Sequence, residues 1–173
     1  MKARLLSFAR RCRERGFTLV ETTAVIAITG TLAATALPRL TALGGEARQA
    51  ALGSAQGALA SVAAMSHAKF LINGETTQTF EDSTMTLVHG YPAANQATAD
   101  AAGLSIGYVV YTGASGGGAT TPPVFAGSMS LVPKAIAGTA RARACYLVYE
   151  QASAASPRPK IRMGDSTTAE TCI

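Results

Sequence analysis

The sequence holds few of the side chains on which catalytic and metal sites are built. It contains two histidines and three cysteines. No set of Ser, Cys or carboxylate residues is spaced around His67 or His89 as a catalytic triad or a metal site requires. We therefore expect structural histidines, a chain that is not an enzyme, and no cofactor or metal.

Charge is also scarce, except at the amino-terminal end. The net charge is +5, and residues 1–16 account for all of it with six basic side chains against one acidic side chain. The nine basic and nine acidic side chains that follow cancel. A positive balance can indicate a nucleic-acid or anionic-lipid partner, but here it belongs to a short leader and not to the body of the protein.

A long apolar run follows the basic residues directly. It covers residues 17–37, and 21 residues in a helix at about 1.5 Å per residue span the roughly 30 Å hydrocarbon core of a bilayer. The positive-inside rule then makes the leader cytoplasmic and places the chain after Leu37 across the membrane. Glu21 is the lone carboxylate in this run. Because an unpaired charge in a bilayer costs roughly 2.5 to 3.5 kcal/mol, we expect Glu21 to have a charged partner or a specific function.

Two plainer interpretations of the run compete with that one. Ala34-Thr35-Ala36 resembles the small-x-small cleavage site of a secretory signal, and an uncleaved membrane anchor is the second alternative. Secretory signals have shorter apolar cores of about 7 to 15 residues and rarely carry a carboxylate near the start of the core. The position of Glu21 argues against both alternatives.

The cysteines fit this topology. Cys12 lies in the leader, whereas Cys145 and Cys172 lie in the part of the chain that is expected in an oxidising compartment. Without the leader, the odd number of cysteines becomes an even pair. We predict a disulfide between Cys145 and Cys172, which contributes roughly 3 to 4 kcal/mol on the chain-entropy model.

The helical pattern continues beyond the apolar run. Apolar residues recur at three- and four-residue spacing through residues 40–63, which predicts one long helix that ends near Asn73-Gly74. The apolar stripe on residues 52–63 should be buried. Because Gly30 lacks a side chain and Pro38 lacks a backbone donor, we expect a kink or local melting between them.

Short strands are predicted after the helix. Runs rich in β-branched and aromatic residues, separated by Gly, Pro, Asn and Ser, cover residues 85–88, 106–111, 124–126, 145–149 and 159–163. A helix followed by clustered strands is typical of the α+β class, in which a small antiparallel sheet packs on the second half of the helix. Residues 113–121 are rich in glycine but lack the Gly-Lys-Ser/Thr of a phosphate-binding loop, so we predict a flexible surface loop.

The segment from Arg15 to Glu21, with Gly30 and Pro38 in the apolar run after it, resembles the cleavage and methylation motif of type IV prepilins. Type II secretion pseudopilins share this motif. Shorter segments are similar to the mannose-sensitive haemagglutinin branch of the type IV pilins, at residues 45–48, 56–59, 90–93 and 145–149. The resemblance implies a type IV pilin-like α+β fold with a disulfide-bounded carboxy-terminal region.

The resemblance also implies how the chain is processed and assembled. A prepilin peptidase and methyltransferase would cut between Gly16 and Phe17 and methylate the new amine of Phe17. Glu21 would then pair with the amine of a subunit already in the filament. Residues 1–16 are in this interpretation a cleaved leader, residues 17–37 a transmembrane and assembly helix, and residues 38–173 a head outside the cytoplasm that includes the second half of the helix.

The implied location is the inner membrane before assembly, with a single span and a cytoplasmic amino terminus, and an extracellular filament afterwards. The implied partners are identical or related pilin subunits, the peptidase, an inner-membrane assembly platform and membrane lipid. The filament would serve adhesion or surface motility.

Two alternatives stay open. The chain could be a type II secretion pseudopilin, although the Cys145 and Cys172 pair favours a pilin, or it could be a minor or tip pilin that binds a surface ligand or DNA. Basic residues near the carboxy terminus could form a binding patch, but few aromatics interleave them and we expect a solvated face. These residues are Arg141, Arg143, Arg158, Lys160 and Arg162. The tyrosines are expected to pack in the core and not against sugars.

Overall fold

The computed structural model describes residues 16–80 and 83–173. It divides into two compact units, of which the first runs to Pro38 and the second covers Arg39–Ile173. The predictions made for the basic residues of the leader and for Cys12 fall on residues 1–15, outside the described residues.

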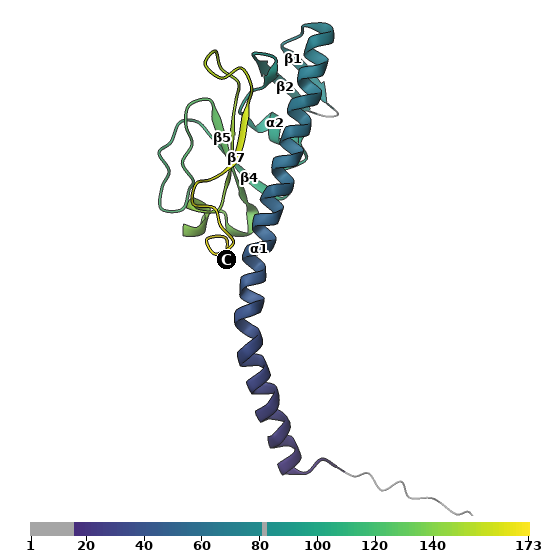
Figure 1. Cartoon of the computed structure of the whole chain (residues 1–173), viewed down its shortest axis with the longest axis vertical. Helices are drawn as coiled ribbons and strands as arrows, with labels where there is room; N and C mark the ends of the chain where they lie inside the picture. The colour runs from purple at the N-terminus through teal and green to yellow at the C-terminus, as the bar shows by residue number, and fades with distance from the viewer. Residues whose placement is uncertain (1–15, 81–82) are drawn as a thin grey trace, which may run out of the picture. The chain divides into compact units, whose positions relative to one another are not determined.

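One helix, α1 (Leu19–Asn73), contributes residues to both units (Figure 1). It is 55 residues long. It ends at Gly74, whose φ of +69° is a conformation that glycine adopts readily and whose N–H donates to the carbonyl of Phe70 at 2.8 Å. The long helix and its predicted end are both confirmed.

Helix α1 continues through Gly30 and Pro38 without interruption. The local melting that we expected between them is therefore not found, and flexibility at these two positions stays a prediction. Threonine hydroxyls in this stretch donate back to helix carbonyls, as Thr29 does to Val25 at 2.7 Å and Thr35 does to Leu32 at 2.9 Å. Such bonds satisfy polar side chains of an apolar helix without any outside partner.

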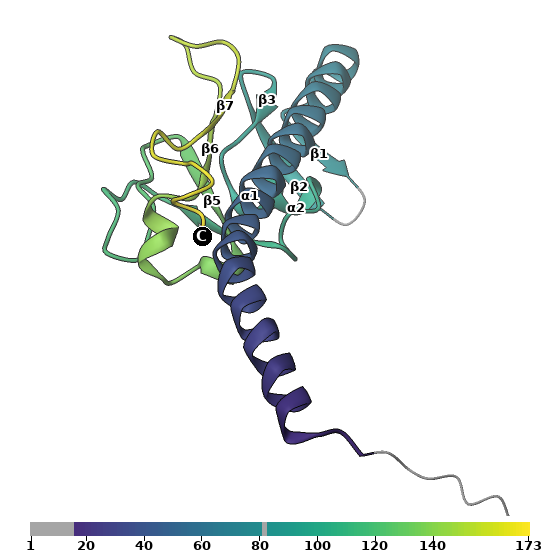
Figure 2. The same cartoon turned by 60° about the horizontal axis from the view of Figure 1, so that its bottom comes forward.

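Two antiparallel sheets follow α1 in the described residues, and in Figure 2 the second half of α1 crosses in front of them. One sheet has the order β1-β2-β3 and the other the order β4-β5-β6-β7. The helix α2 (Gln96–Ala101) lies between them in the sequence. The strands are β1 (Thr77–Phe80), β2 (Ser83–Val88), β3 (Tyr91–Pro92), β4 (Tyr108–Thr112), β5 (Ser128–Pro133), β6 (Leu147–Glu150) and β7 (Lys160–Met163), and two 3₁₀ turns are η1 (Lys134–Ile136) and η2 (Ala140–Arg143).

The α+β class is confirmed, and one of the predicted strands is wrong. Residues 124–126 do not form a strand, because Val124 makes only one isolated bridge, to Ser115. The strand of this region is β5, which the sequence pattern did not indicate. Its serines are buried because their hydroxyls donate to backbone carbonyls, Ser128 to Phe125 at 2.9 Å and Ser130 to Pro123 at 2.8 Å.

The main core lies between the second half of α1 and the four-stranded sheet. Leu52 and Leu59 of α1 are fully buried in one cluster with Leu131 of β5 and Leu147 of β6. A smaller cluster joins Val62 of α1 to residues of β2 and belongs to the three-stranded sheet. The predicted burial of the stripe on residues 52–63 is thus confirmed, with two small sheets in place of one.

Two tyrosines tie the parts of this core together. The hydroxyl of Tyr149, on β6, donates to the carbonyl of Pro92, on β3, at 2.6 Å and so links the two sheets. The hydroxyl of Tyr108 donates to the carbonyl of Ala51 on α1 at 2.7 Å. Burial raises the pKa of both phenols, which keeps them protonated as donors. Tyrosines were predicted to pack in the core, and this is confirmed for Tyr149, which is buried there, and for Tyr108, which packs against it.

The carboxy-terminal segment is held by a disulfide within the second unit and by a hydrogen bond from α1. The predicted disulfide between Cys145 and Cys172 is present, and the guanidinium of Arg48 donates to the carbonyl of Cys172 at 2.6 Å. Nearby, Gly45 is buried, and a Cβ there would collide with the carbonyl of Ala169. The glycine therefore allows the chain to approach the helix closely.

Candidate functional site

The candidate site is the short segment that precedes α1. Gly16, Phe17 and Thr18 are exposed and lie before the first residue of the helix. Phe17 is 84% exposed. A Cβ added at Gly16 would have no atom within 4 Å. Among the described residues there is therefore no steric reason for a glycine at this position.

Thr18 and Glu21 cap the helix reciprocally. The N–H of Glu21 donates to the Thr18 hydroxyl at 3.2 Å, and the N–H of Thr18 donates to the Glu21 carboxylate at 3.5 Å. This is a capping box, which satisfies two backbone donors that a helix start leaves open. A carboxylate in the first turn is also favoured by the helix dipole. The Thr-x-x-Glu spacing at 18–21 is the sequence pattern for this box, so the cap is a feature that the sequence alone could have predicted.

The three predicted residues at this end lie close together. Gly16, Phe17 and Glu21 line one open hollow with Thr18. The peptide bond proposed for cleavage and the carboxylate proposed for pairing are thus presented on the same exposed segment. Gly30 and Pro38 lie farther along α1, and the disulfide belongs to the second unit.

The helix after this segment is apolar and uncovered in the first unit. All of its residues from 19 to 38 are exposed. Large apolar side chains remain more than half exposed, and these are Leu19, Val20, Val25, Ile26, Ile28, Leu32 and Leu37. The helix is long and apolar enough to cross a membrane. Such a surface is stable only where lipid or other apolar helices surround it.

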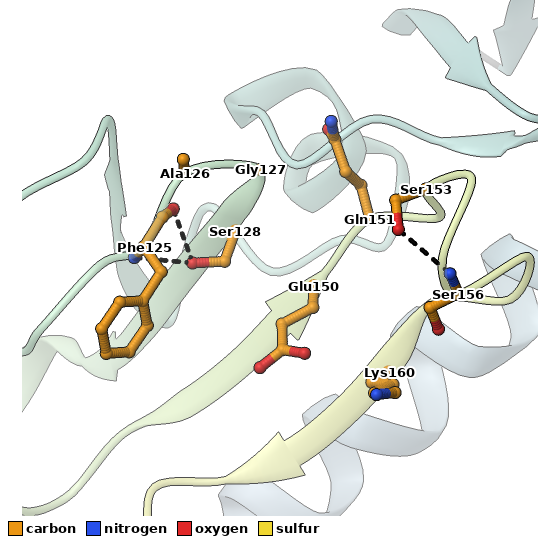
Figure 3. A pocket seen from close by; sticks show the side chains of 9 residues that line it. All are labelled: Phe125, Ala126, Gly127, Ser128, Glu150, Gln151, Ser153, Ser156 and Lys160. Carbon is orange, nitrogen blue, oxygen red and sulfur yellow. Dashed lines mark hydrogen bonds between the residues drawn. The ribbon is translucent and has the colours of Figure 1, made fainter.

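A polar opening in the second unit is lined by residues of β6, β7 and the segment before β5. Figure 3 shows Glu150 and Lys160 on the neighbouring strands β6 and β7, with Phe125 on the far side of the opening. The Glu150 carboxylate accepts from Arg162 at 3.2 Å, and the Ser128 hydroxyl is bonded to the backbone of Phe125. The carboxylate and this hydroxyl are thus each engaged by another group, and neither is bonded to the other as a base is to a nucleophile.

The remaining sequence candidates lie on the surface of the second unit. Arg162 makes ion pairs with Glu150 and with Asp165, the latter at 2.8 Å, whereas Arg141 and Arg143 are exposed on η2. In residues 16–80 and 83–173 there is no group of three or more His, Cys, Asp or Glu side chains that could hold a metal ion. The absence of a metal and of catalysis stays a prediction.

Comparison with known proteins agrees with the location of the site. Residues 11–37 match a family model described as the prokaryotic N-terminal methylation motif. Neither the curated proteins nor the solved structures contain a significant match to this chain. The motif supports a type IV pilin or pseudopilin, and it includes Gly16, Phe17 and Glu21. The mannose-sensitive haemagglutinin branch stays a hypothesis.

Proposed function

We propose that this chain is the structural subunit of a type IV pilus-like filament. The observation that carries the proposal is the N-terminal methylation motif at residues 11–37, placed at the start of an uncovered apolar helix. The pilin-like α+β arrangement of helix, sheets and disulfide supports it. Motif and fold together favour a structural role and not a catalytic one.

The first step of the proposal is removal of the leader. A membrane prepilin peptidase cuts between Gly16 and Phe17 and methylates the amine of Phe17. The exposed backbone on both sides of this bond is accessible to an enzyme. Because a Cβ at Gly16 would meet no atom of residues 18–80 or 83–173, the role proposed for this glycine is to let the catalytic groups of the peptidase approach the backbone.

The second step is assembly. Before assembly, the helix lies in the inner membrane with the head outside the cytoplasm, and an assembly platform moves it from lipid into a bundle of identical or related helices. Glu21 pairs with the amine of Phe17 of a subunit already in the bundle, which sets the axial position of the new subunit. In an apolar bundle this attraction is strong, because it removes two unpaired charges together.

The alternative within the same class is a type II secretion pseudopilin. The disulfide-bounded carboxy-terminal segment favours a pilin. Long surface filaments made from this chain would support the pilin, whereas a secretion defect without such filaments, on deletion of the gene, would support the pseudopilin. Adhesion or surface motility is the proposed task of the filament.

Two variants of Glu21 separate its charge from its capping bond. Glu21→Gln removes the charge but retains a side-chain acceptor for the N–H of Thr18, whereas Glu21→Ala removes both. We expect both variants to enter the membrane and to be cut normally, and neither to enter filaments efficiently. Sheared surface filaments and membranes are compared by immunoblot.

Glu46→Gln is the matched control, because Glu46 is an exposed carboxylate on the second half of the same helix. It should leave filament yield near that of the wild type. Normal filament yield from Glu21→Gln would contradict the proposed charge pairing and leave capping as the role of this residue.

A further inference from the structure

A cavity in the second unit contains both histidines of the chain. It is lined by His67 of α1, by His89 and Tyr91 at the β2–β3 turn, and by Ser156, Pro157 and Arg158 of the loop before β7. Its volume is about 480 Å³. Three segments that are distant in the sequence therefore bring two imidazoles and one guanidinium to one place.

The imidazole of His67 is held in a fixed orientation. Its ring stacks on the ring of Tyr91, with centroids 4.1 Å apart and an angle of 6° between the planes. Its Nδ1 lies 3.1 Å from the carbonyl oxygen of Gly90. Because a carbonyl accepts and does not donate, Nδ1 carries the proton in this bond. The ring stack and the hydrogen bond together hold the His67 ring in place at the wall of the cavity.

The second histidine occupies an unusual backbone conformation. His89 has a φ of +52° and is the non-glycine residue with a positive φ in the described part of the chain. It is followed by Gly90, with a φ of +80°. Turns of this kind favour Asn or Gly at the first position. Histidine is one of the side chains that tolerate this conformation, and the turn places His89 at the wall of the cavity.

The charged side chain that lines the cavity is the basic one of Arg158. None of the residues that line it is acidic. The guanidinium of Arg158 has no ion pair or hydrogen bond in the described residues, unlike that of Arg162 on the same segment, which pairs with Glu150 and Asp165. An arginine without a carboxylate partner, next to two histidines, presents donors to an anion.

An apolar groove continues from this cavity along α1. It shares His67, Tyr91 and Arg158 with the cavity, and its other walls are apolar. One wall consists of Ala60, Ala63, Ala64, Ala68 and Leu71 of α1, and the opposite wall consists of Pro159, just before β7, and Ile161 of β7. A ligand that fills both parts would therefore have an anionic group at one end and an apolar body at the other.

From these observations we infer a binding site for an organic oxyanion, that is, a carboxylate or phosphate group attached to an apolar body. Arg158 donates to the oxyanion, the two histidines flank it, and the apolar body lies on the alanines of α1. The site belongs to the head alone and does not depend on whether the chain forms filaments.

The two histidines make the site directly observable. The full chain, labelled at histidine Cε1 and held in a non-ionic detergent at constant pH, shows two imidazole signals because the sequence has two histidines. Phenyl phosphate, benzoate and inorganic phosphate are added separately, with sodium chloride at matched ionic strength as the blank. We expect saturable shifts with phenyl phosphate or benzoate, and a Kd about tenfold lower for phenyl phosphate than for inorganic phosphate because of the apolar groove.

Arg158→Gln should abolish these shifts, whereas Arg141→Gln, at an exposed arginine that lines neither part of the site, should keep them. Circular dichroism of each variant confirms that the fold is retained. Shifts no larger than those of sodium chloride, or equal shifts in the wild type and Arg158→Gln, would overturn the site. Equal affinity for phenyl phosphate and inorganic phosphate would overturn its apolar part.

Discussion

Thr18 and Glu21 show that one side chain can serve two purposes at the start of α1. In the isolated chain the Glu21 carboxylate accepts from the N–H of Thr18. In the proposed filament it pairs with the amine of another subunit. The capping bond orients the carboxylate at the exposed end of the helix, so the group that pairs in the proposed filament is already in position in the single chain.

Gly16 is the residue at which processing is most directly tested. Gly16→Val should leave most of the chain uncut, because the branched side chain keeps the peptidase from approaching the backbone. We expect the fold of the second unit to be unchanged, because a Cβ at this position would meet none of its atoms. An immunoblot of membranes distinguishes the longer precursor from the cut chain.

Gly57→Val is the matched control for processing. Gly57 is an exposed helix glycine that also has no atom near an added Cβ. The control should be cut as the wild type is. Complete cleavage of Gly16→Val would remove the assignment of Gly16 as the processing residue.

At the scale of elements, the close contact between α1 and the carboxy-terminal segment depends on Gly45. Gly45→Ala should lower the free energy of unfolding by about 1–3 kcal/mol, because the new Cβ meets the backbone carbonyl of Ala169, which cannot rotate away as a side chain would. Thermal unfolding of the full chain in non-ionic detergent, followed by circular dichroism, measures the change.

The same substitution at Gly57 should have the opposite effect. Gly57→Ala lies in the same helix with open space around it, so it should raise the free energy of unfolding by about 0.5–1 kcal/mol through helix propensity. If Gly45→Ala were as stable as Gly57→Ala, the close contact described here would be wrong.

The sequence predicted the long helix well and the strands unevenly, for physical reasons. The end of α1 at Gly74 and the buried stripe at Leu52 and Leu59 follow from local periodicity and from a glycine after the last turn. Strand β5 was missed because it is buried along its whole length, so no alternation of apolar and polar residues marks it, and because its two serines are typical of loops in a sequence pattern.

The candidate site was predictable in its residues and less so in its geometry. The motif from Gly16 to Glu21 is contiguous, so the sequence was enough to find it. The cavity around His67 and Arg158 was not predicted, because its walls come from α1, a turn and a loop that only the folded chain brings together.

For the molecule as a whole, stability depends on the disulfide that joins Cys145 to Cys172 in the second unit. Cys172→Ser should lower the free energy of unfolding by about 2–5 kcal/mol, because the unfolded chain is no longer constrained between Cys145 and Cys172. Urea unfolding of the full chain in non-ionic detergent, with and without a reducing agent, gives the difference.

The reducing agent provides the control for this variant. It should destabilise the wild type by a similar amount and leave Cys172→Ser unchanged. A wild type that is insensitive to reduction, once loss of the disulfide has been verified by thiol labelling, would contradict this structural role.

The central claim is that the chain is trimmed at its amino end and then built into a surface filament. Its most direct test is the intact mass of the chain recovered from filaments sheared off cells. The account predicts a chain that begins at Phe17, carries one methyl group and lacks two hydrogens because of the disulfide. A filament chain that still began at Met1, or one that began after Leu37, would contradict it.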